Sequence, residues 1–397
     1  MRPRHLIAIA AALLLFAGGL TGIMAAAQSG EGQQFAQQGR GDGGGRGRRG
    51  GGGGNGGGRG QPVVLDAAQL AALKAQYVAP KTVPHPADNA PSAARLALGQ
   101  RLFFDPSISA TGKLACASCH DARRGFSDGL ERSIGVKGTP LARHTQTVIN
   151  LAWSKIFFWD GRASTLEEQA VMPINTEDEM GMPHDLMVAT LRLDPAYRRQ
   201  FDAAYPGEGL GVATVGKALA VFERSLVFTN SPFDRWIAGD ENAISEEAKQ
   251  GFIQFNTRGG CFQCHSGWNF SDDGFNDIGI PTDDLGRFAI APGKGTRHAF
   301  KTPSLRNVAE RAPYMHTGQF ASLRQVIRHY DDFERRASLS PKMRNVRVGR
   351  GANIIAFLET LTSPTPPELI RLQEELDRRL GLAPRATFSR AVQTTSR

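Results

Sequence analysis

The chain has 397 residues and a formal net charge of +9 at pH 7. Most of the positive excess lies at the two ends, because residues 1–60 contribute +5 and residues 366–397 contribute +2. The central body is therefore nearly neutral, and the basic composition gives no argument for a nucleic-acid partner. A body of about 300 residues is long enough for two domains of ordinary size.

Residues 1–27 have the pattern of a secretory signal peptide. Two arginines near the start precede an apolar stretch from Leu6 to about Leu20, and Ala25–Ala27 supply small residues for cleavage. A retained membrane anchor is the alternative, because the apolar stretch is near the lower limit for a spanning helix. We expect the mature protein in the periplasm, where no nucleic acid is a partner.

Residues 28–60 consist largely of glycine, arginine and glutamine. Such a segment has few apolar side chains whose burial would offset the entropy lost on ordering, so we expect a disordered linker. Contact of its arginines with an acidic partner or a membrane surface is the alternative.

Seven segments of the body have apolar spacing or end signals typical of helices, and convincing alternating strands are scarce. The expected helices are residues 66–77, Ala93–Phe104 with Ser92 as N-cap, a helix opened by a capping box at Ser164–Glu167, Val212–Val227, Glu246–Asn256 with Ser245 as N-cap, Asn353–Leu361 and Glu368–Leu380.

The pentapeptide Cys-x-x-Cys-His occurs twice, and the two copies contain all four cysteines. In this pattern the thiols form thioethers to haem vinyl groups, and the histidine supplies an axial nitrogen to the iron. A four-cysteine zinc site or two redox dithiols would leave the adjoining histidines unexplained. The sequence therefore predicts two covalently bound c-type haems, held by Cys116, Cys119, His120, Cys261, Cys264 and His265.

We predict a mainly α fold with two cytochrome-c-like haem domains and long loops. Each domain would contain one haem motif, and the apolar face of a porphyrin can organise a domain that lacks an extensive side-chain core. The expected boundaries are a signal peptide at 1–27, a linker at 28–60, an N-terminal wrapping helix at 61–84, a first haem domain at 85–240, a second at 241–365, and a C-terminal helix and tail at 366–397.

Four further stretches are Leu98–Asp105, Phe158–Gln169, Pro173–Met180 and Pro303–Tyr330. Together with the haem motifs they resemble the bacterial di-haem cytochrome c peroxidase and MauG family, over roughly residues 90–362. The resemblance implies a periplasmic oxidoreductase that reduces hydrogen peroxide at the first haem and draws electrons through the second.

The resemblance leaves the electron source open. A reduced cytochrome c or cupredoxin is one implied donor, and MauG-like oxidation of residues on a partner protein is the alternative. The family also allows a homodimer. A non-catalytic di-haem electron-transfer cytochrome is the competing class, and it would have two irons with strong protein ligands on both faces.

The resemblance places three residues at the peroxide-reactive haem. Glu179 matches the family's distal acid and Gln169 its distal glutamine, while Trp159 matches a tryptophan that lies between the haems. A carboxylate there can take a proton from bound peroxide and return it to the departing oxygen. A surface acid within Glu177–Glu179 and simple aromatic packing of Trp159 are the alternatives.

Tyr330 matches the distal ligand of the second haem, which is methionine in many peroxidases of the family and tyrosine in MauG. Leu323, Ile327 and Tyr330 have the spacing of one helix face. A phenolate would favour ferric iron, whereas methionine raises the reduction potential. If Tyr330 is an ordinary packed side chain, Met315 or His329 becomes the expected substitute.

Two departures concern the space between the haems. Val136 stands where many relatives carry a histidine that blocks the first iron, so we expect an open site, with His144 as the alternative displaced ligand. His144 also stands where the family has a calcium-binding asparagine. Because calcium prefers oxygen donors, an inter-haem calcium ion bound by carbonyls of Arg311 and Pro313 is an open expectation.

The resemblance also suggests that Arg162 and Arg306 pair with haem propionates, with a purely structural role as the alternative for each. His316, in a Pro-Tyr-x-His motif, is expected to have a supporting role near the second haem or between the haems.

Overall fold

The computed structural model describes residues 63–331, 339–349 and 351–383. The predicted signal peptide and glycine-arginine linker lie outside these residues. Within the described ranges, no helix combines the length and apolar character needed to cross a membrane. The division into haem domains at residues 240 and 241 stays a prediction.

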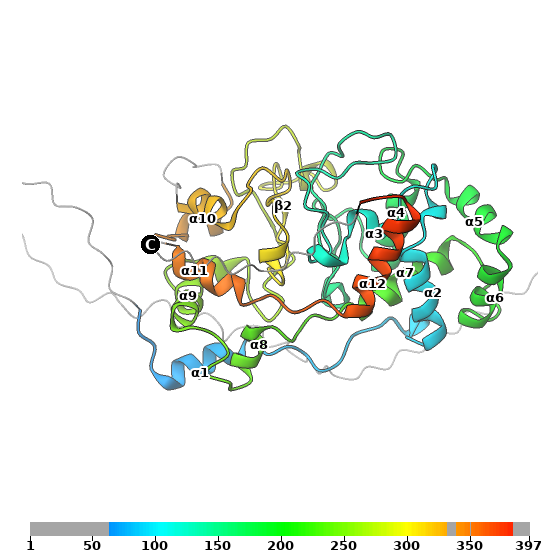
Figure 1. Cartoon of the computed structure of the whole chain (residues 1–397). Helices are drawn as coiled ribbons and strands as arrows, with labels where there is room; N and C mark the ends of the chain where they lie inside the picture. Colours follow the sequence, from blue (N-terminus) through cyan, green and yellow to red (C-terminus); the bar gives the residue numbers. More distant parts are fainter. Residues whose placement is uncertain (1–62, 332–338, 350, 384–397) are drawn as a thin grey trace, which may run out of the picture. The chain divides into compact units, whose positions relative to one another are not determined.

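Figure 1 shows a helical structure with long connecting loops, which confirms the predicted fold class. A short antiparallel pair joins β1 to β2, with Phe275 opposite Lys301. The elements are α1 (Ala67–Ala75), α2 (Ala93–Phe103), α3 (Cys116–Cys119), α4 (Leu166–Asn175), α5 (His184–Leu193), α6 (Pro195–Ala204), α7 (Val212–Ser225), α8 (Pro232–Ile237), α9 (Glu246–Asn256), β1 (Phe275–Asn276), β2 (Phe300–Lys301), α10 (Leu323–Asp331), α11 (Ala352–Glu359) and α12 (Pro367–Arg379).

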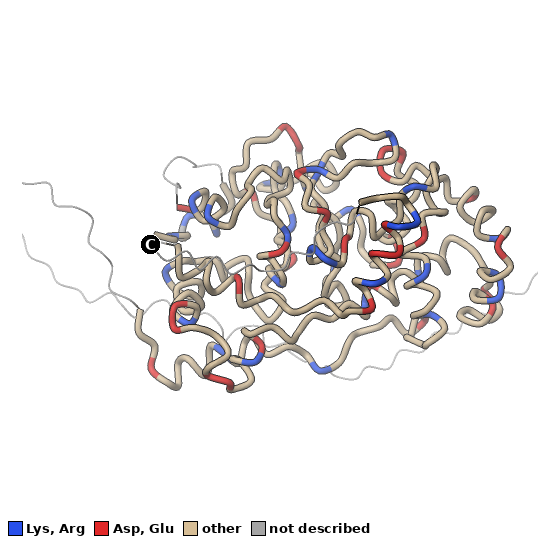
Figure 2. Tube along the Cα trace, viewed as in Figure 1, with Lys and Arg blue, Asp and Glu red and all other residues tan. Residues whose placement is uncertain are grey.

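Serine side chains begin two of the predicted helices as expected. Ser92 caps α2 and Ser245 caps α9, each accepting a hydrogen bond from a backbone N–H of the first turn. Residues of both charge signs are interspersed along the described chain (Figure 2).

The predicted capping box of α4 is wrong by one residue. Thr165 is the N-cap, and its hydroxyl accepts a hydrogen bond from the backbone N–H of Glu168 at 3.1 Å. The Glu168 carboxylate accepts the backbone N–H of Ser164 at 3.0 Å. Glu167 is not free to cap, because its carboxylate pairs with Arg224 of α7 at 2.6 Å.

Two hydrophobic clusters surround the haem motifs. The first includes α2 and α7, where Phe103 and Phe222 are buried with ring centroids 5.0 Å apart. The second includes α9 and α11, where Phe252 and Phe357 have centroids 5.5 Å apart. Such close aromatic contacts supply much of the buried apolar area in clusters of this size.

The first and last helices of the described chain each pack on the half of the body that is farther away in sequence. Tyr77, just after α1, is buried in the second cluster, although the first haem motif is nearer in sequence. Leu369 and Leu376 of α12 are buried in the first cluster. Each end of the described chain therefore packs on the half of the body that is more distant in sequence.

An internal repeat, visible only weakly in the sequence, relates the two halves. Asn150 and Asn307 both have positive φ, at 56° and 53°, and each begins a short 3-10 turn. Bridges then pair Phe157 with Ala163 and Tyr314 with Phe320 at the same interval in both halves. The helices α4 and α10 follow at equal distance. By this register Trp159 corresponds to His316.

Replacing Gly99 by alanine is expected to destabilise the packing of α2 on α7. The added Cβ would lie 2.0 Å from the carbonyl oxygen of Ala218, a backbone atom that cannot rotate away. Overpacking of this kind costs about 1–3 kcal/mol or more, so Gly99→Ala should lower the Tm of the haem-loaded protein, measured by circular dichroism.

The matched control is Gly293→Ala, in an exposed loop where the nearest atom to the new Cβ is 3.8 Å away. Equal melting temperatures for Gly99→Ala and the wild type would contradict the close contact.

Candidate active site

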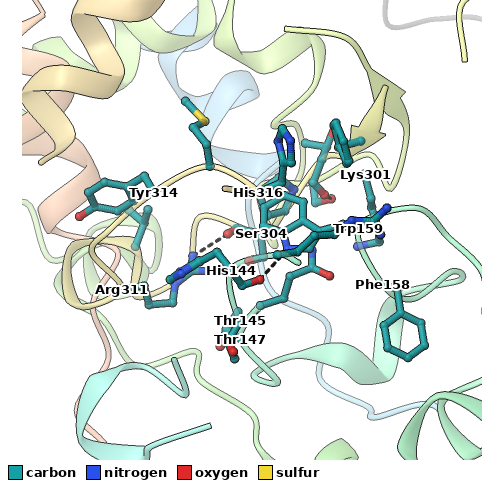
Figure 3. A pocket seen from close by; sticks show the side chains of 18 of the residues that line it. His144, Thr145, Thr147, Phe158, Trp159, Lys301, Ser304, Arg311, Tyr314 and His316 are labelled. Atoms are coloured by element: carbon teal, nitrogen blue, oxygen red, sulfur yellow. Dashed lines mark hydrogen bonds between the residues drawn. The ribbon is translucent and has the colours of Figure 1, made fainter. Parts of the chain in front are cut away.

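A cavity of about 770 Å³ is lined by both Cys-x-x-Cys-His motifs. Figure 3 shows side chains from both halves of the body lining a pocket. The structure thus brings the two motifs, far apart in sequence, to one internal space. The lining residues contributed by the motifs are Cys116, Cys119, His120, Cys261, Cys264 and His265.

Each motif histidine is oriented by a backbone carbonyl. Nδ1 of His120 lies 3.2 Å from the carbonyl oxygen of Phe126, and Nδ1 of His265 lies 2.9 Å from that of Phe270. With the proton on Nδ1, Nε2 keeps the lone pair that a metal requires. Burial lowers the pKa of both histidines, which favours the neutral imidazole.

The two carbonyl groups that accept from the motif histidines belong to residues with an unusual backbone conformation. Phe126 and Phe270 have φ of 59° and 52°, in the left-handed region that larger residues rarely adopt. Both side chains are fully buried, so packing holds this conformation in place. Neither position has a glycine or asparagine that would have predicted it.

The lining residues fit two covalently attached haem groups. Besides thiols and imidazoles at the right spacing, the cavity contains three buried polar atoms without a hydrogen-bond partner in the described structure. Buried polar atoms are rarely left unpaired unless a further group satisfies them. These atoms are Oε1 of Gln169, Oε2 of Glu223 and Nε2 of His316.

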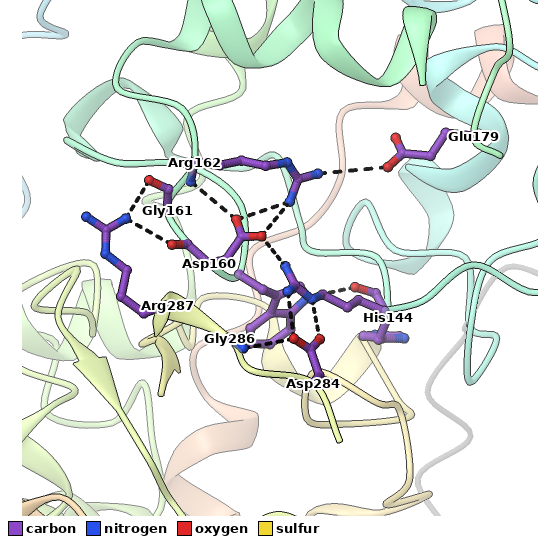
Figure 4. Close-up of polar contacts among 10 residues, drawn as sticks. His144, Asp160, Gly161, Arg162, Glu179, Asp284, Gly286 and Arg287 are labelled. Atoms are coloured by element: carbon purple, nitrogen blue, oxygen red, sulfur yellow. Dashed lines mark hydrogen bonds and ion pairs between the residues drawn. The ribbon is translucent and has the colours of Figure 1, made fainter. Parts of the chain in front are cut away.

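Glu179 and Asp178 both line the cavity, but the carboxylate of Asp178, like that of Glu177, is paired with Lys137. Glu177 and Asp178 are exposed and accept hydrogen bonds from Nζ of Lys137 at 2.7 and 2.8 Å. Burial raises the pKa of Glu179, and the charge of Arg162, 3.9 Å away, partly opposes that rise (Figure 4). The geometry therefore separates Glu179 from an ordinary surface acid.

The segment that contains Val136 is hydrogen-bonded to the turn that contains Glu179. The backbone N–H of Val136 donates to the carbonyl of Glu179 at 2.8 Å. A Cβ on Gly135 would lie 1.7 Å from the carbonyl oxygen of Asp178, so only glycine permits this approach. Valine has no donor atom for iron, and the close docking leaves this segment little room to move.

His144 is buried with both ring nitrogens engaged. Nδ1 lies 2.9 Å from the carbonyl oxygen of Leu130, and Nε2 lies 3.4 Å from the hydroxyl of Ser127. The side chain lines the cavity, but its nitrogens already have protein partners. This arrangement disfavours His144 as a displaced iron ligand.

Trp159 joins the two halves of the molecule. Its indole N–H donates to the carbonyl of His144 at 2.8 Å, and its own carbonyl accepts the N–H of Lys301 in β2. The indole lies near His316 (Figure 3), with ring centroids 6.2 Å apart. His316 in turn stacks on Phe300, with centroids 3.6 Å apart. All five of these residues line the same cavity.

Tyr330 reaches the cavity from α10. Leu323, Ile327 and Tyr330 all line it, which confirms the predicted shared helix face. The Tyr330 hydroxyl has no hydrogen-bond partner among the described residues. Burial, with a smaller effect of the two nearby cysteines, raises its pKa, so a phenolate here would need an adjacent cation.

The substitutes for Tyr330 differ in position. Met315 lines the cavity, whereas His329 is absent from the lining and its Nε2 lies 2.9 Å from the carbonyl oxygen of Ile278. Among the described residues, Met315 is therefore the substitute that shares the space with the second motif.

The two arginines expected at haem propionates have protein partners. Arg162 lines the cavity but pairs with Asp160 at 3.1 Å. Arg306 is fully buried outside the lining, pairs with Asp234 at 2.8 Å and donates from Nε to the carbonyl of Trp268. For Arg306 the structural alternative fits better, because its charge is already neutralised away from the cavity.

Sequence reasoning missed the lining residue Glu223 and considered only the backbone carbonyl of Arg311. Glu223 of α7 is buried, and desolvation raises its pKa to about 8. Arg311 lines the cavity without a carboxylate partner in the described structure. Nothing in the sequence distinguishes the side chains of Glu223 and Arg311, because each stands next to a residue of opposite charge, Arg224 and Glu310 respectively, as surface residues often do.

The fold and the cavity define a mainly α di-haem cytochrome whose two haem sites share one internal space. Residues 93–242 match the family model of the di-haem cytochrome c peroxidases. Methylamine utilization protein MauG of Methylorubrum extorquens is 48% identical over 305 residues, which cover 75% of this chain and 86% of that protein. Cytochrome c551 peroxidase of Pseudomonas aeruginosa is 34% identical, over 68% of this chain and 79% of that protein.

Solved structures agree with these relatives. A MauG-like protein associated with microbial copper homeostasis has a TM-score of 0.67 at 30% identity, covering 74% of this chain and 96% of that one. The diheme peroxidase BthA from Burkholderia thailandensis shares the fold, with a TM-score of 0.59 at 22% identity over 70% of this chain and 90% of that one.

The chain belongs to the di-haem cytochrome c peroxidase and MauG family. It is a peroxidase-type oxidoreductase that carries two haem groups and uses peroxide as electron acceptor.

Replacing Asp234 by asparagine is expected to lower the Tm while leaving the haem absorption spectra unchanged. The fully buried Arg306 would keep its charge without a counter-ion, a loss of about 3–5 kcal/mol. Asp202→Asn, at an exposed acid of α6, is the control and should unfold as the wild type does. A changed haem spectrum with unchanged stability would instead place Arg306 at a propionate.

Proposed function

We propose that hydrogen peroxide is reduced at the haem of the first motif, with Glu179 as the acid–base group. The observation that carries this proposal is the position of Glu179, which lines the same cavity as His120, while the carboxylates of its neighbours Glu177 and Asp178 are paired with Lys137. When bound, the haem groups supply iron that binds peroxide and exchanges single electrons. Glu179 would take a proton from peroxide and return it to the departing oxygen.

The neighbours of Glu179 have supporting roles. The amide of Gln169, whose Oε1 is buried and unpaired in the described structure, would orient peroxide or a water molecule. Burial raises the pKa of Glu179, and the guanidinium of Arg162 limits that rise and so favours the carboxylate form. Trp159 would relay electrons between the two motifs, since it contacts segments of both halves.

The internal repeat supports an open first site and a closed second one. Tyr330 of α10 corresponds to Pro173 of α4, and both line the cavity. A proline side chain has no atom that ligates iron, whereas a tyrosine oxygen does. We propose that Tyr330 is the distal ligand of the second haem and that no residue takes this place at the first.

The proposed setting is the periplasm, reached by the predicted signal peptide at 1–27. Family membership implies a cytochrome electron donor, and a reduced cytochrome c or cupredoxin would refill the second haem. A homodimer is compatible with this scheme.

Glu179→Gln is expected to lower the rate of reaction with peroxide on the order of 10²-fold or more, because the amide cannot accept a proton. The reaction of the wild type should slow as pH falls through the raised pKa of Glu179, since protonation removes the base. Stopped-flow spectroscopy over a pH series measures both effects, and the variant should lack this pH dependence.

Glu177→Gln, at an exposed acid of the same run, is the control and should react as the wild type does. Chemical reduction and reoxidation of both haems should survive in Glu179→Gln. A variant that reacts with peroxide at the wild-type rate would disprove the catalytic role.

Oxidation of residues on a partner protein is the second candidate function. The placement of Tyr330 in the cavity favours it, because a phenolate ligand would stabilise oxidised iron. The 48% identity to a protein named for methylamine utilization points the same way. In this scheme the oxidising equivalents are discharged by a partner's side chain and only slowly by cytochrome c.

Tyr330→Phe is expected to change the spectrum of the second haem and raise its reduction potential, because an anionic oxygen ligand is lost. Redox titration followed by absorption spectroscopy measures both. Tyr314→Phe, at a second tyrosine lining the cavity, is the control and should leave the ligand set intact.

Stopped-flow mixing of the ferric protein with peroxide and then with reduced cytochrome c separates the donors. Rapid multiple turnover would favour cytochrome c as the electron donor. Slow reduction of the oxidised haems by cytochrome c would favour a partner protein as the donor. An unchanged spectrum in Tyr330→Phe would refute the ligand assignment.

A further inference from the structure

Arg311 is unusual among the buried arginines of the described structure. Four arginines are less than a tenth exposed. Arg311 has no carboxylate partner, and Figure 3 shows it among the cavity side chains with a hydrogen bond to Ser304. The other three are paired, Arg123 with Asp121 and Asp377, Arg224 with Glu167, and Arg306 with Asp234.

The contacts that Arg311 makes do not neutralise its charge. Nη2 donates to the carbonyl of Ser304 at 2.6 Å, and Nε donates to that of Asn307 at 3.4 Å. Nη1 has no partner among the described residues. Burial lowers the pKa of Arg311 to about 10, so the side chain is still a cation at neutral pH. A buried cation without a counter-ion is costly, which implies an anion in the cavity.

The position of Arg311 lies between the two haem motifs. Its side chain packs over Gly125 of the first half, where a Cβ would lie 2.9 Å from Cγ of Arg311. Its hydrogen bonds go to carbonyls of the second half, at Ser304 and Asn307. The guanidinium thus acts on both halves, and haem propionates are the anions that the bound cofactors would bring there.

The same region is a poor calcium site. Calcium takes six to eight oxygen ligands, with carboxylates prominent among them. The backbone carbonyls of Arg311 and Pro313 supply only two of the expected oxygen donors. At the third position stands His144, whose two nitrogens bond to Leu130 and Ser127. No group of three or more His, Cys, Asp and Glu residues suited to a metal occurs in the described ranges. A fixed guanidinium beside this point would also repel a divalent cation.

We propose that Arg311 supplies the fixed positive charge between the two haem sites, by pairing with a haem propionate, and that the enzyme works without an inter-haem calcium ion. Arg311 is then a positioning residue that replaces a bound metal by a covalently attached cation. This inference requires the two haem groups but not the proposed roles of Glu179, Trp159 or Tyr330.

The first experiment measures the wild-type holoenzyme as purified. Elemental analysis by mass spectrometry should find no stoichiometric calcium after gel filtration in metal-free buffer. Incubation with the chelator EGTA, and then with added calcium chloride, should leave the absorption spectra and reduction potentials of both haems unchanged. One calcium ion per chain whose removal alters those spectra would overturn the proposal.

The second experiment removes the charge. Arg311→Gln should lower the reduction potential of at least one haem, because loss of a nearby cation favours the more oxidised and more positive iron. Arg311→Lys keeps the charge and should retain most of the wild-type potential. Arg324→Gln removes an exposed arginine of α10, where solvent screens the charge, and should leave both potentials unchanged.

Potentials in Arg311→Gln equal to those of the wild type would overturn the role of the charge. If Arg311→Gln fails to incorporate haem, Arg311→Lys and the calcium content of the wild type still decide the question. A calcium-free wild type that does not react with peroxide, with or without added calcium chloride, would count against the proposed function and leave this inference intact. Peroxide reactivity that appears only after calcium chloride is added would overturn this inference.

Discussion

The structure depends on an internal space that protein side chains do not fill. Both haem motifs, their oriented histidines and several unpaired polar atoms surround one cavity, and the two hydrophobic clusters lie around it. Buried polar groups and an uncompensated arginine are unfavourable unless a cofactor satisfies them. The haem groups are therefore part of the core, and the helices pack against them as well as against each other.

Because the haem motifs must face this cavity, residues with strained backbone and residues in very close contact both occur around it. Phe126 and Phe270 hold left-handed backbone so that their carbonyls reach the motif histidines. Gly135 admits the carbonyl of Asp178 at a distance that no side chain would allow. The surrounding packing, including terminal helices that cross to the opposite cluster, keeps these local arrangements in place.

One repeated framework supports two different haem sites. The turn with Trp159 and the turn with His316 have the same backbone pattern, and α4 and α10 follow them at the same interval. The difference lies in a few side chains, chiefly Pro173 against Tyr330. One framework can therefore present a side chain without a metal-binding atom at one site and a tyrosine oxygen at the other.

The sequence by itself determined the cofactors and most of the helices. Covalent haem attachment needs two thiols and a histidine at fixed local spacing, and helix starts such as Ser92 and Ser245 follow from hydrogen bonds within one turn. These features depend on near neighbours in the chain, so they can be read without the fold. The capping box at α4 failed because a distant residue, Arg224, attracts Glu167.

Only the tertiary structure decided which charges are neutralised and which face the cavity. Arg162, Arg306 and Arg311 look alike in sequence, yet Arg162 pairs with the nearby Asp160, Arg306 pairs with the distant Asp234, and Arg311 meets no carboxylate in the described structure. In the same way, Glu179 turns inward while Glu177 and Asp178 meet Lys137. The fold decides which oppositely charged side chains come close enough to pair. Burial then decides how much free energy an unpaired charge costs.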